Sequence, residues 1–223
     1  MFRHVPNLLT GARMLLAGVF FAMLSWYQYE GRGDPTFLNI AFLVYLVALF
    51  TDFLDGYLAR KWKVEGPFGR VIDPFVDKVL VLGSFAFFAG KNFIIPDIAT
   101  ASGDHGPSAM VVKTITGVTP AMVVILLARE LLVTSLRGIA EGGGVAFGAA
   151  FSGKLKMVLQ SVTILVILIY VNYRAYLADW DGLALWIRNG FIYLTLVVTV
   201  ASAFTYIHRA IGLYRRGAPG LAA

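Results

Sequence analysis

Residues 51–78 read TDFLDGYLARKWKVEGPFGRVIDPFVDK and place four aspartates between two long apolar runs. Asp52 and Asp55 are three residues apart, so they share one face of a helix. Asp73 and Asp77 are four residues apart and share one face of the next helix. A short connection joins the two helices, which therefore run antiparallel as neighbours. We expect the four carboxylates to face one another at similar depth.

Such a cluster of carboxylates indicates a metal site. Four carboxylates so close together cannot all stay ionised without compensation, because repulsion and low dielectric favour protonation. Oxygen-only ligands select hard cations such as Mg²⁺, Mn²⁺ or Ca²⁺. Two such ions on shared carboxylates suit a diphosphate, since they clamp the attacked phosphorus and the leaving phosphate together. Arg60, one helical turn beyond Gly56, is placed to reach a phosphate.

The rest of the chain has the composition of a membrane protein. It has 223 residues, of which 58% are hydrophobic, whereas soluble domains are about 45–50% apolar. A helix needs about 20 apolar residues to cross a bilayer, and six such stretches account for nearly the whole chain. We predict one all-α membrane domain over residues 1–223, with a polar non-cytoplasmic insert at about 93–118. The six predicted transmembrane helices are residues 6–28, 37–60, 69–92, 119–141, 151–177 and 186–212.

The distribution of charge predicts the orientation in the membrane. The formal net charge is +6, and the basic residues flank the apolar stretches, which favours anionic lipid headgroups over nucleic acid as partners. Most of them fall near the two termini or in the 61–68 and 142–150 loops and the helix ends that adjoin them, and basic residues mark the cytoplasmic side. Both termini are therefore expected in the cytoplasm. The chain has no cysteine, which excludes disulfides and thiolate chemistry.

The N-terminal segment resembles a secretory signal peptide in its basic start and apolar run. Arg13, however, lies inside that run, and no clear cleavage site with small residues follows it. We therefore expect a retained first helix.

The aspartate segment fits the pattern D-x2-D-G-x2-A-R-x8-G-x3-D-x3-D at every fixed position. This pattern resembles the signature of the CDP-alcohol phosphotransferase family, and the six-helix layout extends the resemblance over nearly the whole chain. The resemblance implies a homodimer whose active site opens to the cytoplasm, with CDP-diacylglycerol as the lipid donor.

The resemblance also implies a role for each matched residue. Asp52, Asp55 and Asp73 would bind two metal ions, Mg²⁺ or Mn²⁺. Asp77 would be the general base that takes the proton of the acceptor hydroxyl, and it would also contact metal. A carboxylate within hydrogen-bond reach of a hydroxyl is suited to this task. The CDP-binding residues would be Gly56, Ala59, Arg60, Gly69, Asn7 and Thr10.

Further motifs indicate which alcohol accepts the phosphatidyl group. A P-N-x2-T-x2-R pattern occupies residues 6–13, an Arg-Glu pair opens residues 129–137, and Gly-Lys-x-Lys occupies residues 153–156. Together with residues 69–78 they resemble the bacterial inner-membrane branch of the family whose acceptor is sn-glycerol 3-phosphate. That branch usually has Thr where this chain has Met157.

The phosphate of such an acceptor requires basic residues, and arginine binds phosphate in a bidentate manner. We expect Arg129, Arg137 and Lys154 to bind it. Lys154 and Lys156 point apart on a helix, so only one of them reaches the ligand. We assign that role to Lys154 and expect Lys156 to extend toward lipid headgroups.

Two alternatives remain open. In the first, the protein catalyses the same chemistry with another acceptor alcohol. This acceptor is inositol phosphate, another polyol or phosphatidylglycerol. A divalent-cation transporter would also place carboxylates inside a membrane. The clustering of the aspartates at one face argues against transport, because an ion path would distribute polar groups across the membrane.

Overall fold

The computed structural model describes residues 5–29, 31–62, 67–95, 113–143, 151–174, 176 and 180–215. Side chains are described over the same ranges except at residues 5–7, 55–62, 67–74, 113, 151–152 and 213–215. The described chain is almost entirely helical, as predicted. Its long helices are α1 (Val5–Trp26), α2 (Pro35–Trp62), α3 (Pro67–Phe88), α4 (Pro120–Gly142), α5 (Phe151–Tyr173) and α6 (Asp181–Arg215).

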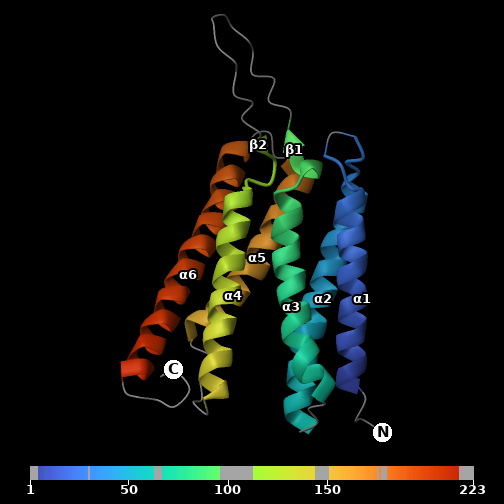
Figure 1. Cartoon of the computed structure of the whole chain (residues 1–223). Coiled ribbons are helices and arrows are strands. Elements are labelled where there is room, and N and C mark those ends of the chain that lie inside the picture. Colours follow the sequence, from blue (N-terminus) through green and yellow to red (C-terminus); the bar gives the residue numbers. More distant parts are fainter. Residues whose placement is uncertain are drawn as a thin grey trace, which may run out of the picture.

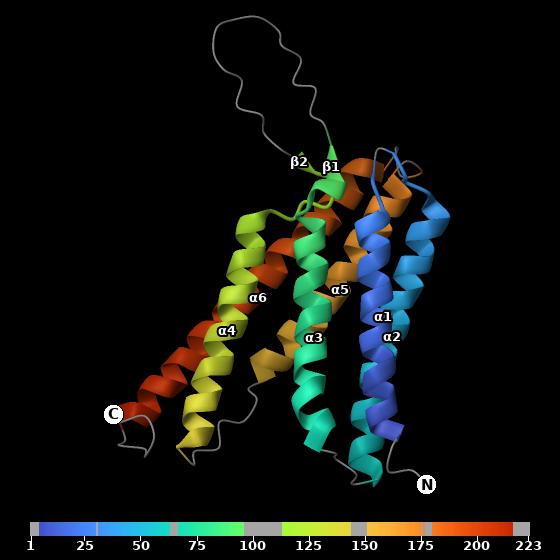
Figure 2. The ribbon, with the colours of Figure 1, turned by 45° about the vertical axis from the view of Figure 1, so that its right-hand side comes forward.

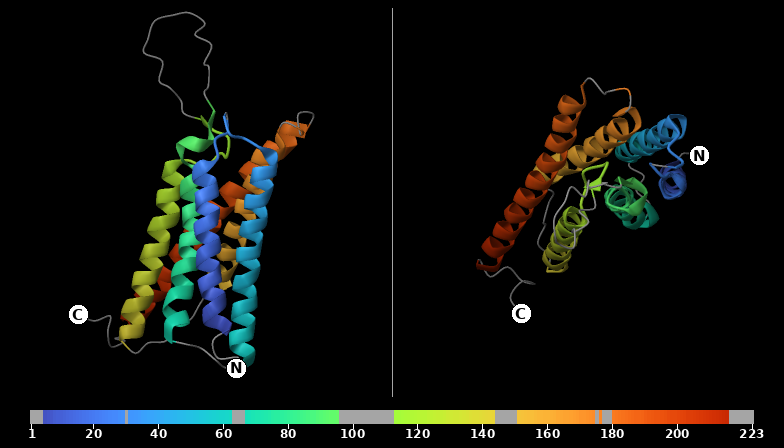
Figure 3. Two further views of the ribbon diagram at one scale, coloured as in Figure 1. Left: turned by 90° about the vertical axis from the view of Figure 1, so that its right-hand side faces the viewer. Right: turned by 90° about the horizontal axis from the view of Figure 1, so that it is seen from above.

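The helices run alternately up and down and form an antiparallel bundle (Figure 1). Helix α1 packs against both α2 and α3, α4 packs on α6, and α5 joins these groups through contacts with α2, α3 and α6. Viewed along the bundle, α3 lies between α1 and α4 (Figure 3). The starts of α1, α3 and α5 and the ends of α2, α4 and α6 lie at one end, which we call the lower end (Figure 2).

Local sequence signals fix where several helices begin. Helices α2, α3 and α4 start with Pro35, Pro67 and Pro120. Proline suits this position, because the amide hydrogen that it lacks would have no partner in the first turn. At α4 the Thr119 side chain also accepts a hydrogen bond from Met122 N at 3.4 Å, which caps the helix.

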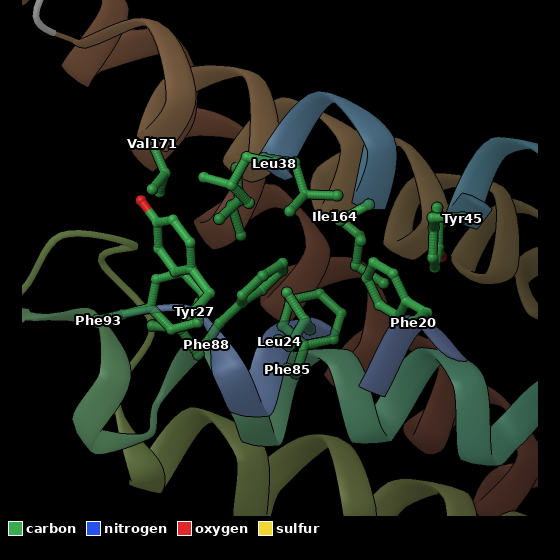
Figure 4. Packing of buried hydrophobic residues seen from close by; sticks show 14 of the residues in the cluster. Phe20, Leu24, Tyr27, Leu38, Tyr45, Phe85, Phe88, Phe93, Ile164 and Val171 are labelled. Atoms are coloured by element: carbon green, nitrogen blue, oxygen red, sulfur yellow. The ribbon is translucent and has the colours of Figure 1, made fainter. Parts of the chain in front are cut away.

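Aromatic side chains fill the core toward the upper end (Figure 4). The rings of Phe20 in α1 and Tyr45 in α2 have centroids 5.2 Å apart. Phe88 of α3 meets Phe93 edge to face at 5.6 Å. Such pairs add to the stabilisation from burial alone. The layer around Phe20, Phe85 and Phe88 is therefore tightly packed and apolar.

The outer surface of the bundle is also apolar. Leu15, Phe53, Val197 and Phe204 are all exposed. A surface of this kind is unfavourable in water and is suited to a lipid environment. The described helices thus have the character of a membrane protein.

Among the described residues, length and composition qualify four helices as candidate membrane spans. The qualifying stretches are Leu8–Trp26, Pro35–Leu54, Gly153–Tyr173 and Asp181–Gly212. Helices α3 and α4 are of similar length, at 22 and 23 residues, but their lower halves carry several charged residues. The prediction of a helical membrane bundle is confirmed, whereas the count of six spans stays a prediction.

Two of the predicted helices end four residues earlier in the structure than predicted. The third, predicted to reach residue 92, ends at Phe88 because the chain turns at Gly90 into a 3-10 helix, η2 (Lys91–Phe93). The fifth, predicted to reach residue 177, ends at Tyr173.

The ends of the predicted polar insert are not polar loops. Strand β1 (Ile94–Ile95) pairs antiparallel with β2 (Lys113–Thr114), and Phe93, Ile115 and Val118 are buried. Both ends of the insert therefore belong to the core, because apolar residues flank the polar stretch on both sides. The polar non-cytoplasmic insert itself stays a prediction. Residues 96–112 lie outside the described part of the chain.

Arg188 of α6 fixes the second end of the insert to the bundle. Its Nη1 donates a hydrogen bond to the carbonyl oxygen of Ile115 at 2.6 Å, and its guanidinium lies 4.5 Å from the ring centroid of Tyr170. Gly117 adopts a φ of +73° beside this guanidinium, a conformation that favours glycine.

Candidate active site

Arg13 of α1 joins the two described aspartates of the signature. Its Nη1 lies 2.8 Å from Asp52 Oδ1 of α2 and 2.8 Å from Asp77 Oδ1 of α3. The arginine is only 1% exposed, whereas the side chains of Asp52 and Asp77 are 39% and 23% exposed. The prediction that these two carboxylates meet at similar depth is confirmed, and they form the partly open wall of a site.

The other two aspartates lie in the same helices, and their side chains are outside the described part. Asp55 follows Asp52 by one turn in α2, and Asp73 precedes Asp77 by one turn in α3. Both positions are nearer the lower end. Among the described residues, no group of three His, Cys, Asp or Glu converges on one point. The four-aspartate metal site therefore stays a prediction.

The predicted CDP-binding residues are only partly described. Thr10 is buried one turn before Arg13 in α1, so the two lie on the same face of the helix. The side chains of the remaining five fall outside the described part. They are Asn7, Gly56, Ala59, Arg60 and Gly69.

A cavity of about 590 Å³ opens beside Asp77, between α3, α4, α5 and α6. All three predicted phosphate-binding residues line it: Arg129, Arg137 and Lys154. The lining also includes Lys78, whose Nζ donates to Thr134 Oγ1 at 2.6 Å. The full set of charged side chains in the lining is Asp77, Lys78, Arg129, Glu130, Arg137, Glu141, Lys154 and Lys156.

A buried charged network forms one wall of this cavity. Glu130 Oε1 accepts a hydrogen bond from Arg129 Nη1 at 2.8 Å and is paired with Lys156 Nζ. Arg129 Nε donates to Ser202 Oγ of α6 at 3.0 Å, and its guanidinium lies 5.6 Å from the ring centroid of Tyr206. These contacts hold two cations of α4 and α5 in fixed positions.

The orientation expected for Lys156 is wrong. Lys156 is 4% exposed and lies inside the bundle, whereas Lys154 is exposed at the cavity wall. Burial in α5 follows residues 156, 160, 163 and 167, which is the period of one helix face. The polar Gln160 and Thr163 on this face were the signal that the lower part of α5 faces a polar interior.

Two hydrogen-bond donors in the cavity wall lack a protein partner among the described residues. They are Arg137 Nε and Gln160 Nε2, and both are buried. A buried donor without an acceptor costs roughly 1–3 kcal/mol. Such groups in a cavity wall indicate a ligand that accepts hydrogen bonds.

The structure is thus that of a helical membrane protein in which carboxylates of α2 and α3 lie beside a cavity lined by basic residues. The family model for CDP-alcohol phosphatidyltransferase matches residues 3–201, and the chain belongs to this family.

Several bacterial proteins are similar to this chain, two of those described here over most of their length. A CDP-diacylglycerol–glycerol-3-phosphate 3-phosphatidyltransferase of Bacillus subtilis (strain 168) is 27% identical over 216 residues, which cover 92% of this chain and 94% of the relative. A protein of the same name from Escherichia coli (strain K12) is 27% identical over 213 residues, or 93% and 94% of the two chains. The one from Cereibacter sphaeroides is 38% identical over 93 residues, or 41% and 39%.

Proposed function

We propose that this protein transfers the phosphatidyl group of CDP-diacylglycerol to sn-glycerol 3-phosphate, giving phosphatidylglycerol phosphate and CMP. The observation that carries the proposal is the basic cavity that opens beside Asp77. The names of the relatives from Bacillus subtilis and Escherichia coli specify the same donor and acceptor.

The cavity has the chemistry that a phosphate monoester requires. Lys156 and Arg129 supply positive charge from buried positions, and Arg137 and Gln160 supply donors without a protein partner among the described residues. A phosphate offers several acceptor oxygens to such groups, and charge-assisted hydrogen bonds are the stronger ones. The acceptor phosphate would bind here, with its terminal hydroxyl directed to Asp77.

Asp77 would act as the general base. The hydroxyl oxygen of the acceptor forms a bond to the phosphorus of the phosphatidyl group as its proton passes to Asp77. The bond from that phosphorus to the bridging diphosphate oxygen breaks, and CMP leaves with the electron pair. The partial exposure of Asp77 at the cavity supports this role, because the base must reach the hydroxyl.

The carboxylates suit a hard divalent cation. Asp52 and Asp77 come from two helices and converge on one cationic nitrogen, and oxygen donors of this kind select Mg²⁺ or Mn²⁺. Asp52, Asp55, Asp73 and Asp77 would hold two such ions, which supply charge stabilisation for the diphosphate when bound.

The same proposal includes a bacterial inner membrane location with six spans, cytoplasmic termini and a homodimeric state. Helices α3 and α4 lie alongside the four qualifying spans in one bundle (Figure 1). At about 1.5 Å per residue they reach the thickness of a bilayer core. The basic residues at the lower end support a cytoplasmic site.

An assay with defined acceptors tests the activity. Purified protein receives labelled CDP-diacylglycerol with sn-glycerol 3-phosphate, inositol phosphate, glycerol or phosphatidylglycerol, with Mg²⁺, Mn²⁺ or a chelator. We expect CMP and a labelled phosphatidylglycerol phosphate only with glycerol 3-phosphate and metal. Product from another alcohol alone would assign a different acceptor. Activity that survives complete chelation would contradict the metal site.

The transporter alternative gains no support from the described residues. The buried core of the described residues includes Phe20, Phe85 and Phe88 and is mainly apolar, whereas an ion path would require polar groups across the membrane. Metal flux into liposomes that depends on the aspartates, without CMP release, would reverse this conclusion.

A further inference from the structure

Arg13 is the most deeply buried charged residue among the described residues of the candidate site. It lies in the apolar helix α1 and is 1% exposed. Placing an arginine in such surroundings costs several kcal/mol unless it is paired. Its pairing with carboxylates of α2 and α3 offsets this cost. The arginine therefore belongs to the site and not to the lipid interface.

A single nitrogen makes both described contacts. Arg13 Nη1 carries two hydrogens and lies 2.8 Å from one oxygen of Asp52 and 2.8 Å from one oxygen of Asp77. A positive charge thus occupies the point where two carboxylates from different helices converge. A Mg²⁺ ion shared by the same oxygens would lie about 2.0–2.1 Å from each. The nitrogen and such an ion cannot occupy this point together.

We propose that Arg13 is an internal counter-ion that holds Asp52 and Asp77 together without metal and competes with divalent cations for Asp52. This inference rests on the proposed metal site. Arg13 is here a positioning residue, because it acts through the two carboxylates. The contacts of Arg13 with both aspartates preserve the convergent arrangement of α1, α2 and α3 in the metal-free protein. Its competition with divalent cations lowers the affinity of the site for metal.

The inference predicts opposite effects of one substitution. In Arg13→Gln the two carboxylates face each other without the guanidinium, so the metal-free protein unfolds at a lower temperature. The same variant binds Mn²⁺ more tightly, because a neighbouring cation has been removed. A unit charge at contact distance near a protein surface changes an affinity by about tenfold or more.

The test is a Mn²⁺ titration of the chelator-treated full-length protein in detergent, followed by electron paramagnetic resonance of free Mn²⁺ and by thermal unfolding. Arg209→Gln is the control, since it removes an exposed arginine of α6 near the same end. We expect about tenfold tighter Mn²⁺ binding and a lower metal-free unfolding temperature for Arg13→Gln, and neither change for Arg209→Gln.

The outcomes separate the two proposals. A wild-type protein that binds no Mn²⁺ contradicts the metal site itself. If the wild-type protein binds Mn²⁺ and Arg13→Gln binds it equally or more weakly, the counter-ion role is overturned and the metal site stands. If Arg13→Gln cannot be purified without metal, we expect Mn²⁺ during purification to restore the folded protein. A variant that stays unfolded with Mn²⁺ present also overturns the role.

Discussion

The substitution Lys156→Met tests which lysine of α5 serves the cavity. Methionine has a similar length and apolar character, so it fits a buried position and removes only the charge. Lys156 is 4% exposed and contacts Glu130 in the cavity wall, whereas Lys154 is exposed. A matched substitution, Lys154→Met, removes the same charge two residues away on the same helix.

The expected magnitudes differ because water screens the two charges differently. A hydrogen bond to a charged group contributes about 1.5–3 kcal/mol, which corresponds to roughly 10- to 100-fold in KM. We expect this increase in the KM for glycerol 3-phosphate in Lys156→Met. An exposed ion pair contributes about 0–1 kcal/mol, so Lys154→Met should raise the same KM by no more than about fivefold.

The assay measures CMP release while glycerol 3-phosphate and CDP-diacylglycerol are varied separately. The KM for the lipid donor should stay unchanged in both variants, since neither lysine is assigned to CDP. Thermal unfolding of Lys156→Met checks that the loss is local, because Glu130 keeps its contact with Arg129 at 2.8 Å. A larger KM effect from Lys154→Met than from Lys156→Met would refute the assignment from burial.

Three further predictions concern the base, the packing and the topology. Asp77→Asn should lower kcat by about 10²–10⁴-fold if Asp77 is the general base; CMP release within tenfold of the wild type would contradict that role. Gly83→Ala should destabilise the bundle by about 1–3 kcal/mol, because the added carbon would lie 2.5 Å from Cζ of Phe21. Gly18→Ala is the control, since nothing lies within 4 Å of a carbon added there. Denaturation in detergent compares the free energies of unfolding of the two variants. Because the chain has no cysteine, Glu141→Cys and Trp180→Cys report the two ends of the bundle. A membrane-impermeant maleimide should label only Trp180→Cys in intact spheroplasts, and labelling of Glu141→Cys from outside would reverse the orientation.

The sequence predicted the helices well because their signals are local. Long apolar runs separated by glycine, proline and charged residues specify both the number and the order of the helices. The carboxylates of Asp52 and Asp77 were also placed correctly relative to each other, since helix spacing and a short connection leave little freedom. Both aspartates contact Arg13 in the structure, and the family match extends over residues 3–201.

Rotations of whole helices were not predictable in the same way. Whether Lys154 or Lys156 faces the interior depends on how α5 packs between α2, α3 and α6. Both lysines lie at the start of the helix, where a basic residue is equally consistent with the membrane interface. The pairing of Lys156 with Glu130 joins residues far apart in the sequence, and no local pattern specifies it.

The ends of the insert were missed for a different reason. Ile94–Ile95 and Lys113–Thr114 are two-residue strands, which are too short to show an alternating pattern. Their pairing depends on buried neighbours such as Ile115 and on Arg188 of α6. Composition alone therefore described this segment only as polar.

The charges that keep α3 and α4 from qualifying as apolar spans also explain how the site works. The upper parts of both helices are apolar, whereas charged residues begin near the midpoints, with Asp77 and Lys78 in α3 and Arg129 and Glu130 in α4. Charged groups at this depth are tolerated only when they face each other or a water-filled space, and the 590 Å³ cavity between these helices provides that space. In the proposed function, a water-soluble phosphate would enter this cavity while the lipid-linked donor stays in the bilayer. The uneven polarity of two helices thus places the cavity where the proposed substrates would meet.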